Sequence, residues 1–145
     1  PPDECPARGY RAEHANTLMA RMDQRLALGR EMDELDGTPT ADGRCALWVR
    51  MPELLEMSGA ALAILGDYVP FGIGQALGLR AGGNSLDNTL RLERLVPTDW
   101  VLLDVRVHAV AHGYGHGLVH LWAEDGTLLA TASQSTIVRF WEEPK

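Results

Sequence analysis

A chain of 145 residues is long enough for one domain, and its 46% hydrophobic and 23% charged residues are typical of a folded globular protein rather than a disordered one. The net charge of −7 argues against a nucleic-acid partner, because phosphate backbones are bound by basic patches and the chain has no run of Lys or Arg. Neither an uninterrupted run of 18 apolar residues nor a basic segment followed by an apolar one is present, so we expect no membrane partner and no secretory leader.

The N-terminal segment and the two cysteines suggest where the protein works. Residues 1–17 hold three prolines, mixed charges and no apolar period, which predicts a linker or a disordered tail. Cys5 lies in this segment and Cys45 in a predicted strand, so they do not form the cysteine framework of a small secreted protein. Two free thiols indicate a reducing compartment, and we expect a cytoplasmic protein.

The first half of the chain mixes helix and strand patterns. Residues 18–28 fit either period, residues 29–43 are an acidic loop with glycines, and residues 44–51 alternate with the period of a strand. Pro52 fits the first turn of a helix, and the apolar residues after it predict a buried helix as far as Gly66. Residues 67–83 indicate an irregular connection with one helical turn at 73–77.

The remaining sequence predicts one strand after another. Apolar and polar residues alternate along the chain, and Asp125-Gly126 is a strong signal for a two-residue hairpin turn. We therefore expect an α+β architecture, with one long helix against an antiparallel sheet of five to six strands. The strands predicted here are residues 85–95, 100–111, 118–122 and 128–141, with a bend at 113–117.

Two motifs in the second half resemble a known family. They are Ser85-Leu86-Asp87-Asn88, and Gln134 within the strand that follows the Asp125-Gly126 turn. The segment from Asn84 to Trp141 resembles the C-terminal hotdog domain of the acyl-CoA thioesterase II (TesB-like) family. The resemblance implies a hotdog fold, a first strand at 22–28, and residues 1–17 as a linker. Residues 18–145 would then be a hotdog thioesterase domain, the C-terminal half of a tandem double hotdog.

The resemblance also implies catalytic residues. In the family an Asp at this motif activates the water that attacks the thioester carbonyl, and a Gln in the later strand holds the same water. These positions are Asp87 and Gln134 here. The residues alone allow plainer roles: alternation places Asp87 on one strand face with Ser85, as a solvated carboxylate, and a Gln among apolar residues must satisfy both ends of its amide.

The third family position is usually Thr or Ser, and counting from Trp100 this chain has His108 there. An imidazole can take up a proton near neutral pH, so His108 is a further water ligand, a base partner to Asp87 or a passive replacement. A hairpin turning at Tyr114 would pair the histidines around it, but no Cys or carboxylate joins them at ligand spacing, so we expect structural histidines and no metal. The histidines are His108, His112, His116 and His120.

The expected function is hydrolysis of fatty acyl-CoA to free acid and CoA by a held water, without a cofactor. Two alternatives stay open: a non-catalytic acyl-CoA-binding or assembly module, and a hotdog dehydratase. The predicted helix at 52–66 lacks the His on which hotdog dehydratases generally rely. Because a free sheet edge is normally covered, we expect a homo-oligomer or pairing with a second hotdog domain.

Overall fold

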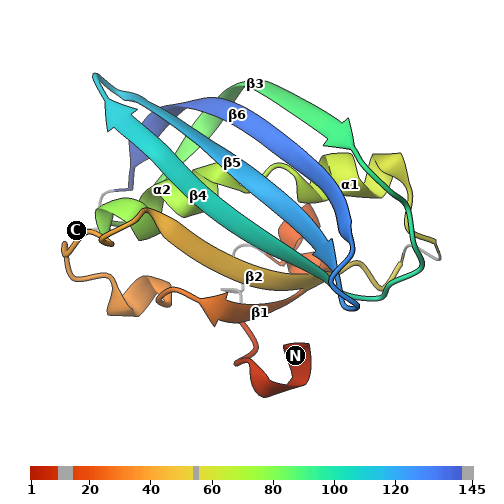
Figure 1. Ribbon diagram of the computed structural model, residues 1–145. Helices are drawn as coiled ribbons and strands as arrows, with labels where there is room; N and C mark the ends of the chain where they lie inside the picture. Colours follow the sequence, from red (N-terminus) through yellow and green to blue (C-terminus); the bar gives the residue numbers. More distant parts are fainter. Residues whose placement is uncertain (10–14, 54–55, 142–145) are drawn as a thin grey trace.

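The strands predicted from sequence form one antiparallel sheet that curves around two short helices (Figure 1). The computed structural model describes residues 1–9, 15–53 and 56–141. Within them, the six strands lie in the order β1-β2-β4-β5-β6-β3, so the strand after the helices returns to the far edge beside β6. The elements are β1 (Asp23–Leu28), β2 (Arg44–Arg50), α1 (Gly59–Leu65), α2 (Val69–Leu77), β3 (Ala81–Leu92), β4 (Val101–Ala111), β5 (Tyr114–Ala123) and β6 (Leu128–Phe140), with short 3-10 helices at Pro2–Glu4, Leu18–Arg21 and Met32–Glu34.

The helical region differs from the prediction at both ends. α1 begins only at Gly59, because the Ser58 hydroxyl caps it by accepting the Ala61 N–H at 3.1 Å. Residues 52 and 53 lie in a turn before it, and Leu54 and Leu55 of the predicted helix lie outside the described residues. α2 is a nine-residue helix instead of a single turn, since Pro70 falls in its first turn, where a missing N–H costs nothing. A break at 66–68 separates the two helices.

The sheet buries both helices. Leu62, Leu65, Val69 and Ile73 are fully buried with the inward residues of the central strands, among them Val105, Val119 and Leu121. By length and composition alone, the 19 residues Gly59–Leu77, with a mean hydropathy of 1.3, could span a membrane. The core helix of a soluble protein passes the same test, and 56% of this apolar window is buried inside the structure. The core therefore accounts for the apolar stretch.

The hairpin between β4 and β5 differs from the prediction, and a glycine within β5 lets α2 approach the sheet. The bend predicted at 113–117 is wrong: the chain turns at His112 and Gly113, which have φ values of 55° and 82°, and is extended from Tyr114 onward. The turn centre is thus shifted, and His116 pairs with Ala109 rather than with His112. Gly117 lies inside β5, where a Cβ would come within 2.6 Å of the Arg106 carbonyl oxygen and 3.2 Å of Val69 on α2.

The two edges of the sheet differ. On the β1 side, Ala7 bridges to Arg25, the Arg8 N–H donates to the Gln24 carbonyl (2.9 Å), and the Leu26 N–H donates to the Pro6 carbonyl (3.0 Å). Part of the segment predicted as a linker or tail thus pairs with the sheet, and Figure 1 shows it beneath β1. At the other edge, β3 is paired with β6, and no strand from the described ranges lies on its outer side.

Candidate active site

Three distant segments meet at the side chain of Gln134 on β6. Gln134 is fully buried (0% exposed), as its small and apolar neighbours in the sequence indicate. Its Nε2 donates to the Asp67 carboxylate, in the break between α1 and α2, and to the Ser85 hydroxyl of β3 at 2.7 Å. Asn88, which pairs with Gln134 across the two strands, donates to the Gly66 carbonyl at 3.4 Å. The break between the helices is thereby fastened to β6 and β3.

These contacts fix the orientation of the Gln134 amide. A carboxylate only accepts hydrogen bonds, so the amide nitrogen must face Asp67. Both protons of Nε2 are then engaged, and the Ser85 hydroxyl donates its own proton to the Asp87 carbonyl (3.1 Å). Gln134 Oε1 is buried and has no hydrogen-bond partner among the described residues. Leaving a buried acceptor unpaired costs about 1–3 kcal/mol, so Oε1 favours one additional donor.

Asp67 is exposed and follows directly on the end of α1. The Gly66 N–H donates to the Leu62 carbonyl at 2.8 Å, and Gly66 packs so closely that a Cβ there would lie 3.0 Å from that of Ala132 on β6. Ala132 precedes Gln134 by two residues on the same strand face. Gly66 therefore brings the break near the amide, and Asp67 lies two residues before the first residue of α2.

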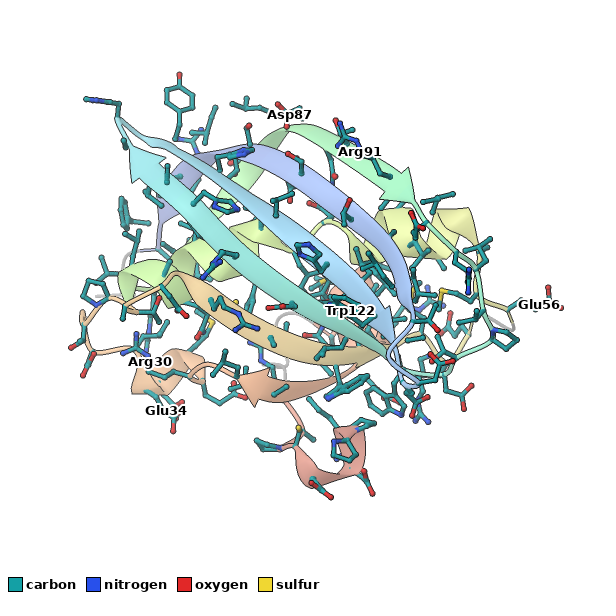
Figure 2. All side chains as sticks on the ribbon, viewed as in Figure 1. Arg30, Glu34, Glu56, Asp87, Arg91 and Trp122 are labelled. Atoms are coloured by element: carbon teal, nitrogen blue, oxygen red, sulfur yellow. The ribbon has the colours of Figure 1, made fainter. Side chains whose placement is uncertain are left out.

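Asp87 lies on the other face of the sheet, and the prediction that it shares a face with Ser85 is wrong. The cause is a bulge at Leu86: Ser85 pairs with Thr136, whereas Asp87 pairs with the next residue along β6, Ser135. Because paired residues share a face and neighbours alternate, Ser85 faces inward with Gln134 and Asp87 faces outward. Asp87 accepts the Ser135 N–H at 2.9 Å and is exposed at the rim of the sheet (Figure 2).

His108 belongs to this outer face as well. It lies at a second bulge, between Val107 and Ala109 of β4, and its ring centroid is 6.2 Å from that of His116. The Nδ1 atom of His116 is 3.3 Å from the Ser135 hydroxyl, next to Asp87. The structure thus separates Asp87 and His108 from Gln134, and a catalytic role for either stays a prediction. The described part of the chain contains no group of three or more His, Cys, Asp or Glu residues that could hold a metal ion.

Asp67 and Ser85 are the site residues that sequence reasoning missed. A signal for Asp67 was present, because it is the only charged residue between Glu56 and Arg80 in an otherwise apolar helical stretch. An isolated carboxylate in such a stretch must reach solvent or a polar partner. Ser85 was part of the recognised motif, but regular alternation could not show that it and Asp87 face opposite ways.

Known proteins share this arrangement of strands and helices. A family model described as the acyl-CoA thioesterase C-terminal domain matches residues 2–138. A candidate thioesterase from Novosphingobium aromaticivorans is 32% identical, with 94% of this chain and 51% of that chain covered and a TM-score of 0.76. A protein with a hot dog fold from Alicyclobacillus acidocaldarius is 25% identical, with 100% of this chain and 53% of that chain covered and a TM-score of 0.76.

A third similar structure is the acyl-CoA thioesterase II TesB2 from Mycobacterium marinum, at 22% identity, 98% of this chain and 54% of that chain covered, and a TM-score of 0.67. No curated protein sequence matches this chain. The chain spans about half the length of each of the three structures. The predicted hotdog fold, a six-stranded antiparallel sheet around a central helical stretch, is confirmed.

Proposed function

Because this chain belongs to the family of acyl-CoA thioesterase C-terminal domains, we propose that it hydrolyses acyl-CoA thioesters, with Asp67 as general base and Gln134 and Ser85 as positioning residues. The family supports thioester hydrolysis in general. The observation that carries the more specific proposal is the Gln134 amide, which is bonded to Asp67 and Ser85 and keeps a buried acceptor, Oε1, for one further donor.

The chemistry needs one water molecule beside this amide. The water donates one proton toward Gln134 Oε1 and the other toward the Asp67 carboxylate, which is suited to act as a general base at hydrogen-bond distance. As the water oxygen forms a bond to the thioester carbonyl carbon, Asp67 takes up a proton. Collapse of the tetrahedral intermediate breaks the C–S bond, and the same proton passes to the leaving sulfur. The products are a carboxylic acid and the thiol of CoA, and Asp67 is again ionised.

The intermediate places negative charge on the former carbonyl oxygen, which requires N–H donors. The first turn of α2 begins two residues after Asp67, and N–H groups in a first helical turn have no intrahelical acceptor. Val69 and Phe71 would supply such donors, whereas Pro70 has none. This arrangement puts the proposed base and the proposed oxyanion donors at one break in the helical stretch.

Single-turnover hydrolysis of acyl-CoAs of different chain lengths tests the proposal, with wild type compared with Gln134→Ala. We expect wild type to release CoA and the variant to be slower by on the order of 10², the scale of a lost positioning or electrostatic contact. Ser135→Ala, on the same strand but the outer face, is the matched control and should keep wild-type activity. Binding of acyl-CoA to wild type without any hydrolysis would reject the thioesterase and favour the binding-module alternative.

The alternatives have lost support from particular residues. The binding-module alternative depends on the third family position, where His108 replaces the usual Thr or Ser and a catalytic hydroxyl is lost. The Ser85 hydroxyl, however, accepts a hydrogen bond from Gln134 and supplies a hydroxyl at the proposed site. The dehydratase alternative would need a His on the central helical stretch, and Gly59–Leu77 contains none. We also propose a cytoplasmic location, supported by the free thiols of Cys5 and Cys45, and association with a like domain, supported by the open edge of β3.

A further inference from the structure

The side chain of Arg8 is only 10% exposed, although it carries a full charge. Its Nε donates to Glu31 at 3.4 Å, its Nη1 donates to Gln24 Oε1 at 3.1 Å, and its guanidinium carbon lies 4.7 Å from the ring centroid of Phe71. Burying a cation is costly unless such partners compensate it. Arg8 thus joins the N-terminal segment to β1 and to the first turn of α2.

The contact with Gln24 continues to the break between the helices. A guanidinium only donates hydrogen bonds, so Arg8 holds the oxygen of the Gln24 amide and turns its nitrogen the other way. That nitrogen donates to the Tyr68 hydroxyl at 3.0 Å, and the hydroxyl donates to the sulfur of Met22 at 3.6 Å. Gln24 and Tyr68 are 3% and 1% exposed, so this directional chain of hydrogen bonds is shielded from solvent.

Tyr68 is the residue between Asp67 and the start of α2, and Phe71 lies in the first turn of α2. Arg8 therefore holds the segment that carries the proposed base in two ways, through Gln24 and Tyr68 and through the Phe71 ring. We propose that Arg8 is a positioning residue for Asp67. This inference rests on the proposed function, because it assigns Arg8 a kinetic effect only if Asp67 is the base.

The experiment compares kcat, KM and amide hydrogen exchange in three variants. Arg8→Met keeps the aliphatic stem but removes the donors and the charge, Tyr68→Phe removes the hydroxyl, and Arg8→Lys keeps a cation and a donor. We expect Arg8→Met and Tyr68→Phe each to lower kcat about tenfold or more with KM within about twofold, because small displacements of a reacting group cost that much or more. Arg8→Lys should recover most of the loss.

Two further readouts separate positioning from stability. The double variant Arg8→Met/Tyr68→Phe should be about as slow as the slower single variant, since both changes break one chain. Hydrogen exchange of a peptide covering residues 66–73 should rise in Arg8→Met. Arg21→Met is the matched control, because the Arg21 guanidinium pairs with Glu53 at the surface, where the two side chains are 60% and 62% exposed. Neither kcat nor hydrogen exchange at residues 66–73 should change in this variant.

Unchanged kcat and unchanged exchange at 66–73 in Arg8→Met would overturn the inference. So would a lower melting temperature with wild-type kcat, because Arg8 would then contribute only to stability. If wild type hydrolyses no acyl-CoA, the proposed function fails. The exchange comparison between Arg8→Met and Arg21→Met then decides separately whether Arg8 holds the break between the helices.

Discussion

Replacing Asp67 by Asn tests the proposed base with little disturbance of its surroundings. Asn removes the negative charge and the basic oxygen, yet its side-chain carbonyl can still accept the hydrogen bond from Gln134 Nε2. General bases contribute about 10²- to 10⁴-fold to a rate. At about 1.36 kcal/mol per tenfold, the variant should lose about 2.7–5.4 kcal/mol of transition-state stabilisation. Because Asp67 is exposed, the free energy of unfolding should change by less than about 1 kcal/mol.

The assay measures release of the CoA thiol at saturating acyl-CoA, with unfolding by urea recorded for the same samples. Asp87→Asn is the matched control. It makes the same substitution on β3, but on the outer face of the sheet, away from Gln134. Its side-chain oxygen can still accept the Ser135 N–H, so we expect kcat within about twofold of wild type.

The opposite pattern would refute the reasoning from Gln134. If Asp87→Asn loses 10²-fold or more while Asp67→Asn keeps wild-type kcat, the assignment made from sequence is right and the contact between Gln134 and Asp67 is only structural. Full activity in both variants would reject a carboxylate base at either position.

Three further predictions concern stability and assembly. Gly117→Ala should destabilise the fold by about 1–3 kcal/mol in urea, because its Cβ would overlap the Arg106 carbonyl, whereas Gly9→Ala, with open space around it, should have no effect. Burial raises the pKa of Cys45 from 9.0 to about 12, so above about pH 9 the native state keeps a proton that the unfolded state loses. The contribution of Cys45 to the free energy of unfolding should be full below about pH 9 and fall as the pH rises toward 12, and Cys45→Ala should reduce this slope in urea titrations. Light scattering should show that the domain associates, and Leu92→Lys on the edge strand β3 should weaken this association. A wild-type protein that stays a monodisperse monomer at high concentration would contradict the prediction.

The sheet could be predicted from the sequence because its two faces differ in polarity. β2, β4 and β6 alternate apolar and polar residues, and their positions follow the predicted ranges closely. Gln134 could be singled out for a related reason, since a buried amide in a strand of small residues needs particular partners. Its main partner, however, is 67 residues away in the chain and could not be found by local pattern.

Local irregularities explain the remaining differences. The bulge at Leu86 reverses the face of every residue after it relative to simple alternation, which misplaced Asp87. Pro70 and the glycines after it indicated an irregular connection at 67–83, so the prediction reduced α2 to a single turn, although Pro70 lies in the first turn of α2, where a missing N–H costs nothing. The His112-Gly113 turn requires positive φ at a residue other than glycine, which moved the hairpin away from the symmetric centre at Tyr114.

The unequal edges of the sheet limit how copies of this domain can grow into larger assemblies. Residues 6–8 pair with part of β1 from within the same chain, whereas no strand of the described residues lies on the outer side of β3. When two identical strands pair antiparallel, a two-fold axis relates them and each uses up the edge of the other. Addition through the β3 edge therefore stops at two sheets, and growth beyond two sheets has to use the β1 edge, which residues 6–8 already cover in part.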